Sequence, residues 1–198
     1  MKSIFEIKNK ETIKEVLDLA EFGTLAICKG NKPYSLPVNF VYLDKFIYFH
    51  GSVKGRKIDI LKDNPFASFS VVEPYSVIQS YFSSKDNLAC PVTHFFKSIL
   101  IDGKVEFVED YTEKIQVLSA LMHKLQKEGK YKPLTEEVYK KIIDATTVYK
   151  IVVDNLSVKF KFGQNLSQER FDMIIKHLEK RGDKRDISTV KLMKEMKN

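Results

Sequence analysis

The sequence contains little cysteine, glycine and proline and no tryptophan, and it lacks any long apolar run. Two cysteines, Cys28 and Cys90, without CxxC spacing exclude a disulfide-rich framework and a cysteine zinc site. Eight glycines and six prolines are too few for a collagen-like or low-complexity chain. The longest apolar runs, such as residues 25–28 and 98–101, fall far short of the roughly 20 residues that span a bilayer. No membrane-spanning segment is therefore predicted.

Charge and apolar content are those of an ordinary globular protein, with 43% hydrophobic and 30% charged residues. The length favours a single domain over residues 1–198. Residues 1–20 interleave lysine and glutamate where a secretory signal needs an apolar stretch, so we expect a cytoplasmic location. Of the net charge of +7, much lies in residues 176–198, which hold eight Lys and Arg against four Asp and Glu. A solvated basic tail explains this excess, and nucleic acid is not an expected partner.

Strand patterns dominate the chain and helical patterns follow in its second half. The β-rich runs are 24–28, 34–42, 46–50, 66–72, 75–80, 95–109, 147–153 and 158–162. Helical spacing of apolar residues occurs at 12–20, 58–62, 112–126, 135–143, 167–179 and 187–196. This order favours a mainly β (α+β) fold, an antiparallel barrel of at least six strands with peripheral helices, over a doubly wound parallel sheet. Pro37 cannot donate to a sheet, so its position should be an edge, a bulge or exposed backbone.

Residues 50–57 are the most suggestive local feature. They combine small residues, the hydroxyl of Ser52 and three cations, Lys54, Arg56 and Lys57, just before a short helix whose first amides are free. This combination suits a phosphate group. A solvated basic turn at an ordinary helix start explains the same residues, and neither GxxxxGK[ST] nor GxGxxG is present. From the residues alone both interpretations stay open.

A series of short motifs along the chain resembles one flavoprotein family. The motifs are Thr24-Leu25-Ala26-Ile27, Pro33-Tyr34, Pro37-Val38-Asn39-Phe40, Ile47-Tyr48-Phe49-His50-Gly51-Ser52, Gly55-Arg56-Lys57, Phe96-Lys97-Ser98-Ile99, Gly103-Lys104-Val105-Glu106 and Lys161-Phe162-Gly163-Gln164-Asn165. Their order is similar to that of the pyridoxamine-phosphate-oxidase-related flavin-binding split barrels, and within them to the nitroimidazole-resistance reductase branch. The resemblance runs from about residue 8 to residue 178. It implies a six-stranded antiparallel split β-barrel that binds FMN.

The resemblance also implies where FMN binds, namely at a homodimer interface to which both chains contribute. It places the backbone of Pro37, Val38 and Asn39 beside the flavin ring. It places His50, Gly51, Ser52, Gly55, Arg56 and Lys57 around the phosphate and ribityl chain. Lys97 and Ser98 on the long strand also reach the cofactor, and Gln164 and Asn165 are further candidates. Lys97 stands where the family commonly has arginine, so it supplies a point charge without the bidentate fork.

The expected function is that of an FMN-dependent oxidoreductase. Reduced flavin, with a nicotinamide as electron donor, would reduce a small acceptor such as a nitroaromatic compound. His50 is the candidate catalytic residue, as proton donor or substrate contact, because it is the only histidine in the cofactor loop and titrates near neutral pH. A purely structural role of His50 stays open. No metal site is expected, because the histidines and cysteines lack metal-ligand spacing.

Other functions remain open beside this one. The chain could be a non-catalytic flavin sensor or transcriptional regulator whose basic tail binds DNA. It could also be a haem-binding split barrel, for which His50, His94 or His177 would have to ligate the iron. Pyridoxamine-phosphate oxidase activity itself is not expected, because that enzyme's arginine and histidine motif near the C-terminus is missing.

Overall fold

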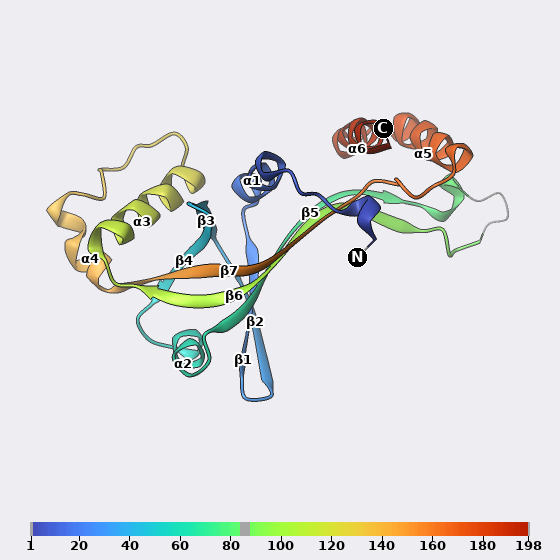
Figure 1. Ribbon diagram of the computed structural model, residues 1–198. Coiled ribbons are helices and arrows are strands. Elements are labelled where there is room, and N and C mark those ends of the chain that lie inside the picture. Colours follow the sequence, from blue (N-terminus) through green and yellow to red (C-terminus); the bar gives the residue numbers. More distant parts are fainter. Residues whose placement is uncertain (1, 84–87, 198) are drawn as a thin grey trace. The chain divides into compact units, whose positions relative to one another are not determined.

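A computed structural model describes residues 2–83 and 88–197 of the chain (Figure 1). These residues form two compact units, and three strands contribute to both: β5 (Phe66–Ile78), β6 (Thr93–Val108) and β7 (Thr146–Lys161). The barrel unit holds residues 10–71 and 99–157. The helical unit holds residues 2–9, 72–98 apart from 84–87, and 158–197. The expectation of one domain over residues 1–198 stays a prediction. Residues 83–93, whose polar composition predicts a loop closed by Pro91, lie partly outside the described residues.

The barrel unit is built on a seven-stranded sheet in the order β2-β1-β5-β6-β7-β4-β3. Its other strands are β1 (Gly23–Lys29), β2 (Lys32–Val38), β3 (Phe40–Leu43) and β4 (Phe46–Ser52). β2 and β3 are the outermost strands in this order, yet only Asn39 separates them in the chain. The sheet therefore curves until its two edges meet at Asn39, which is the closure expected of a barrel.

This architecture confirms the predicted α+β fold with an antiparallel sheet and peripheral helices, but with seven strands rather than six. The predicted strand 34–42 is two strands, because β2 pairs with β1 whereas β3 pairs with β4. Between them, the Asn39 side chain donates a hydrogen bond to the Glu21 carbonyl oxygen (3.0 Å). Pro37 lies on the outer strand β2, as expected for a residue without an N–H. Conversely, runs predicted as separate strands join within β5 and β7.

Four helices belong to the barrel unit: α1 (Lys10–Leu19), α2 (Arg56–Asp63), α3 (Tyr111–Leu125) and α4 (Lys140–Asp144), the last preceded by the 3-10 turn η3 (Glu137–Tyr139). The first three match helices predicted from apolar spacing, while the run predicted at 135–143 divides into η3 and α4. Asp110 caps α3 by accepting a hydrogen bond from the backbone N–H of Glu113 (2.7 Å). Apolar spacing in the sequence therefore predicts the positions of α1, α2 and α3 correctly.

Lys124, near the end of α3, ties α1 and α3 to the start of β3. Its ammonium donates hydrogen bonds to the carbonyl oxygens of Leu17 (2.9 Å) and Phe40 (3.1 Å), and it lies 4.0 Å from the centre of the Phe40 ring. Burial disfavours the charged form and lowers the pKa of Lys124 to about 8. The backbone directly after Asn39 is thus held by a partly desolvated cation.

The lowered pKa of Lys124 predicts a stability that rises with alkaline pH. The Lys124 ammonium loses its proton near pH 10.4 in the unfolded chain and near pH 8 in the folded chain. Below pH 8 the folded protein therefore bears the full free-energy cost of burying the charged ammonium, and this cost decreases as pH rises above 8. We expect the free energy of unfolding to rise by about 1 kcal/mol between pH 7.5 and 9.5, allowing for solvent screening. Urea titrations at both pH values measure this. Lys124→Met should lose most of the rise, because Lys57 contributes in the same direction, and exposed Lys127→Met should keep it; an unchanged rise in Lys124→Met would contradict the assignment.

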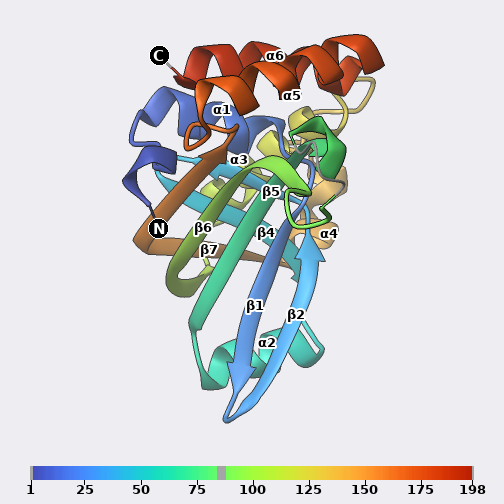
Figure 2. The ribbon, with the colours of Figure 1, turned by 90° about the vertical axis from the view of Figure 1, so that its right-hand side faces the viewer.

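The helical unit contains η1 (Ser3–Phe5), η2 (Ser80–Phe82), α5 (Gln168–Arg181) and α6 (Lys184–Lys197). The last two lie side by side (Figure 2). Asp186 is 1% exposed and accepts hydrogen bonds from Arg181 (2.5 Å) and from Ser76 (2.5 Å), and the Arg181 contact lowers its pKa. The predicted basic tail is therefore a packed helix, although the side chains of Lys191 and Lys194 remain exposed. No helix in the described part of the chain is long and apolar enough to cross a membrane.

Candidate functional site

The predicted site residues fall into two sets, one in each unit. The set in the barrel unit comprises Pro37, Val38, Asn39, His50, Gly51, Ser52, Gly55, Arg56 and Lys57. The set in the helical unit comprises Lys97, Ser98, Gln164 and Asn165. The local surroundings of the two sets differ, because the cations of the first set have no acidic partner among the described residues, whereas Lys97 and Gln164 of the second bind groups of their own unit.

The β3–β4 hairpin brings the first two motifs of the barrel unit together. In this hairpin Phe40 pairs with Phe49. Asn39 directly precedes Phe40 and His50 directly follows Phe49, so Asn39 and His50 lie at the same end of the antiparallel pair. The residues expected beside a flavin ring and those expected around a phosphate are therefore neighbours in the sheet, and their contact with a cofactor stays a prediction.

The ammonium of Lys57 contacts both the backbone of the 50–57 segment and two neighbouring aromatic rings. Lys57 lies in the first turn of α2, and its Nζ donates a hydrogen bond to the carbonyl oxygen of His50 (3.3 Å). It also lies 4.8 Å from the centre of the Tyr149 ring and 5.2 Å from that of Phe49. These two rings stack with centroids 4.8 Å apart. Burial lowers the pKa of Lys57, so this cation is short of solvation.

The hydrogen-bonding capacity of this ammonium and of the neighbouring Tyr149 hydroxyl is largely unused within the described residues. An ammonium has three N–H donors, and the described residues provide Lys57 with one hydrogen bond, from the His50 carbonyl oxygen. The hydroxyl of Tyr149 is buried, and no group in the described structure meets the geometry of a hydrogen bond to it; burial raises its pKa, and the nearby Thr147 side chain lowers it to a smaller extent. A Cβ at Gly51 would collide with Nζ of Lys57, so glycine leaves room for the cation. These groups fit an anionic oxygen ligand such as a phosphate.

The turn before α2 presents further cations to solvent. Gly55 adopts a φ of 122°, a conformation that favours glycine, and α2 begins at the next residue. The guanidinium of Arg56 lies 4.2 Å from the centre of the Tyr34 ring on β2. The backbone N–H of Lys54 donates to the Ser52 hydroxyl (3.2 Å), which shapes the turn. Arg56 is thus positioned by stacking while its side chain stays exposed for a charged ligand.

His50 ends its hairpin with an exposed side chain. Protein atoms that desolvate its imidazole, and next the charge of Lys57, lower the pKa of His50. Its usual pKa is about 6.5, so the imidazole is largely neutral at neutral pH. A neutral imidazole has one N–H donor and one acceptor nitrogen. The structure therefore favours a role of His50 as a neutral hydrogen-bonding group over a role as a protonated acid.

In the helical unit, Lys97 has a protein counter-ion. It is 9% exposed, and its Nζ lies 3.6 Å from Oε2 of Glu73. The ammonium also lies 5.2 Å and 5.1 Å from the centres of the Tyr75 and Phe160 rings. Tyr75 donates a hydrogen bond to the other Glu73 oxygen (2.9 Å). The charge expected to face the cofactor is therefore balanced within its own unit.

Gln164 makes local backbone hydrogen bonds. Its side-chain N–H donates to the Phe160 carbonyl oxygen (2.8 Å), and its oxygen accepts from the Phe162 N–H (2.8 Å). The buried amide thereby stabilises the end of β7, while Asn165 is exposed and Ser98 is half-buried. Cofactor contact by these three residues stays a prediction.

Sequence reasoning missed Tyr149 and Tyr34, both of which contact the cations of the 50–57 segment. Tyr149 sits opposite Phe49 because β4 pairs with β7, and the strand pattern at 147–153 carries no sign of that register. Tyr34 was part of one motif of the resemblance, but the sequence did not predict that its ring contacts Arg56. The described residues contain no group of three or more His, Cys, Asp and Glu side chains that could hold a metal ion.

Comparisons with known proteins identify relatives of this chain. A family model described as pyridoxamine 5'-phosphate oxidase matches residues 9–160. The chain is 22% identical over 186 residues to the protease synthase and sporulation protein PAI 2 of Bacillus subtilis, covering 88% of this chain and 86% of that protein.

Solved structures show the same fold. A candidate 5-nitroimidazole antibiotic resistance protein from Bacteroides thetaiotaomicron is 24% identical, with a TM-score of 0.63 and coverage of 78% of this chain and 85% of that one. An FAD- and haem-binding protein from Mycobacterium smegmatis is 20% identical, with a TM-score of 0.66 and coverage of 80% and 74%.

Proposed function

The chain belongs to the pyridoxamine 5'-phosphate oxidase family, and on that premise we propose that it is an FMN-dependent oxidoreductase that reduces a small acceptor such as a nitroaromatic compound. The observation that carries the proposal is the pair of unsatisfied donors at Lys57 and Tyr149, beside the turn that leads into α2. The likeness to a candidate nitroimidazole resistance protein supports the acceptor class. The likeness to an FAD- and haem-binding protein supports a flavin.

In the proposed mechanism, bound flavin supplies the two-electron chemistry. Lys57 and Arg56 would hold the phosphate oxygens, and the Tyr149 hydroxyl would donate a further hydrogen bond. Backbone groups of residues 37–39 would hold the flavin, and the Asn39 contact to Glu21 and the Lys124 contact to the Phe40 carbonyl oxygen keep this backbone in place. At the same end of the hairpin, the neutral imidazole of His50 donates its N–H to the acceptor and orients it.

A visible absorption spectrum of the purified protein tests the cofactor. We expect the bands of oxidised flavin, and mass spectrometry of the released cofactor should identify FMN rather than FAD. A Soret band would instead show haem and contradict the proposal, as would the absence of flavin binding after addition of FMN. Anaerobic addition of a nicotinamide donor should bleach the flavin bands, and a nitroaromatic acceptor should restore them.

A flavin-responsive regulator is the second candidate function. It is favoured by the nearly full-length likeness to a protein named for protease synthesis and sporulation, and by the exposed lysines of α6. This candidate predicts flavin that binds but does not turn over with acceptors, together with DNA binding that weakens when Lys191 and Lys194 are replaced by methionine. Multiple turnovers with an acceptor, without a shift of DNA in a gel, would favour the enzyme.

We also propose that the protein is a homodimer with FMN at the subunit interface, as is implied by the family resemblance. Sedimentation of the FMN-loaded protein at micromolar concentration should give about twice the chain mass of 23.0 kDa. A monomer that still binds one FMN tightly would contradict the shared site.

A further inference from the structure

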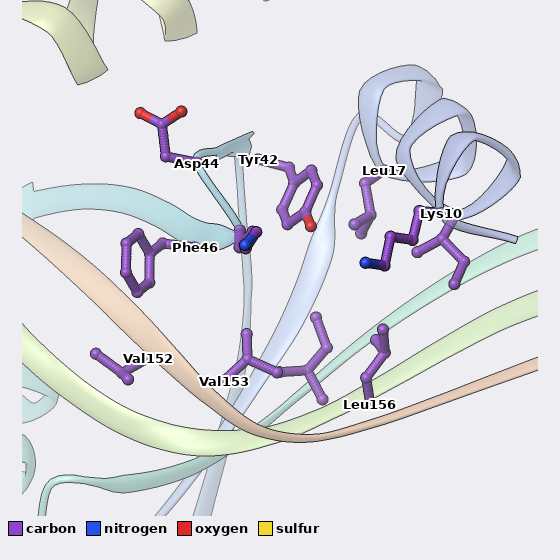
Figure 3. A pocket seen from close by; sticks show the side chains of 11 residues that line it. Lys10, Leu17, Tyr42, Asp44, Phe46, Val152, Val153 and Leu156 are labelled. Atoms are coloured by element: carbon purple, nitrogen blue, oxygen red, sulfur yellow. The ribbon is translucent and has the colours of Figure 1, made fainter. Parts of the chain in front are cut away.

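A cavity lies at the opposite end of the β3–β4 hairpin from His50 (Figure 3). Its volume is about 430 Å³, within the range of small-molecule sites, and its walls come from α1, β3, β4, β6 and β7 of the barrel unit. Phe46, one of its lining residues, is four residues before His50 on β4. At about 3.3 Å per residue this corresponds to about 13 Å along the strand. The cavity is therefore separate from the 50–57 turn.

The walls of this cavity are mostly apolar. Ile13 and Leu17 of α1 face it from one side, and Val153 and Leu156 of β7 from the other. Leu17 is only 1% exposed, which anchors α1 on the barrel, whereas Leu156 is 46% exposed and lies at the opening. Such walls favour a ligand whose body is a hydrocarbon or an aromatic ring.

Two side chains that can donate hydrogen bonds point into the cavity. Figure 3 shows the ammonium of Lys10 and the hydroxyl of Tyr42 pointing into the hollow, while the carboxylate of Asp44 points away from it. Asp44 and Lys45 form the two-residue turn of the hairpin, with φ of 48° and 75°, a left-handed pair typical of type I′ turns. The ammonium of Lys10 and the phenol of Tyr42 thus point into the cavity, whereas Asp44, the acidic residue among those that line it, points away.

We propose that this cavity binds a small amphiphilic monoanion, a carboxylate on an apolar body of medium chain length. The carboxylate accepts hydrogen bonds from Lys10 and Tyr42, and the apolar body lies between α1 and β7. The volume excludes long double-chain lipids, and the hydrocarbon walls exclude a strongly hydrated ion such as free phosphate. The site is separate from the flavin function and does not depend on it.

Isothermal titration with decanoate, decanol and decyltrimethylammonium tests the ligand class. We expect saturable binding of decanoate at one site per chain, several-fold weaker binding of decanol and the weakest binding of the cation. From hexanoate to decanoate the affinity should rise about threefold per methylene, as buried CH₂ groups leave water. Equal affinity for the cation and the anion would overturn the proposal, and so would the absence of saturable decanoate binding.

Variants locate the binding. Val153→Phe should fill the cavity and lower decanoate affinity at least tenfold, and Lys10→Met should lower it about threefold to tenfold, because the Lys10 side chain is solvent-exposed. The matched control Lys14→Met removes a lysine of the same helix that pairs with Asp18 outside the cavity, and it should bind like the wild type. Thermal melting checks that each variant is folded. Unchanged decanoate affinity in folded Val153→Phe would overturn the location.

Competition separates this site from the flavin site. Decanoate affinity should be the same with and without saturating FMN, and Val153→Phe should bind FMN like the wild type. Displacement of decanoate by FMN would overturn the proposal of a separate site. If the protein binds no FMN, the flavin proposal fails while the decanoate titrations still test this one.

Discussion

Replacement of His50 by alanine is expected to lower acceptor turnover per bound flavin by about a hundredfold, the lower range for groups that act on protons or hydrogen bonds in a reaction. His50 follows the β3–β4 ladder at the end where Asn39 lies, and its side chain is exposed there. The flavin should stay bound, because the phosphate contacts come from Lys57 and Arg56. Flavin occupancy from absorbance, measured beside the rate of flavin reoxidation by the acceptor, separates the two effects.

A control and a pH profile sharpen this test. His123→Ala removes an exposed histidine of α3 and should leave the rate unchanged. Because burial and Lys57 lower the pKa of His50, the neutral form should dominate above pH 6.5, and turnover should fall only as pH drops through that lowered pKa. A rate that instead falls as pH rises through the same range would show the imidazolium as proton donor. An unchanged reoxidation rate per bound flavin in His50→Ala would remove His50 from the mechanism.

The second large effect is expected at Lys57, where Lys57→Met should weaken FMN binding about tenfold to a hundredfold. Charge-assisted hydrogen bonds contribute roughly 1.5 to 3 kcal/mol, and this half-buried ammonium has only the His50 carbonyl oxygen as described acceptor. Methionine has an unbranched apolar side chain of similar length, so it can replace the ammonium above Phe49 and Tyr149 without a charge. Fluorescence titration of the apoprotein with FMN measures the affinity.

Controls at the same turn separate a phosphate site from a basic surface. Lys54→Met removes an exposed cation of the turn and should change FMN affinity less than threefold. Tyr149→Phe removes the unsatisfied hydroxyl and should cost about fivefold in affinity, with the folded state no less stable. Arg56→Ala should resemble Lys57→Met. Stacking on Tyr34 holds the Arg56 guanidinium at the turn, with its donors exposed for a phosphate. If Lys54→Met and Lys57→Met lowered FMN affinity equally, the 50–57 segment would be a solvated basic turn and not a phosphate site.

Much of the local structure could be predicted because short-range physics sets it. Apolar spacing located α1 and α3 to within two residues, and Pro37 correctly indicated an outer strand because proline has no N–H to donate. The order of motifs indicated the family. The single strand predicted at 34–42 was wrong, since the change of pairing partner at Asn39 depends on barrel closure rather than on the residues of that run.

By itself, the sequence determined the α+β class, the antiparallel β-rich core and the cationic turn before α2, because periodicity, turn residues and charge are local properties. Only the tertiary structure decided which groups meet. Pairing of β4 with β7 brings Tyr149 against Lys57, the ion pair with Glu73 engages Lys97, and α3 carries Lys124 to the Phe40 carbonyl oxygen. Each contact joins residues that are distant in the chain. Strand register and helix packing bring these residues together, and both depend on the free energy of burying the whole core. A short stretch of sequence therefore cannot predict these contacts.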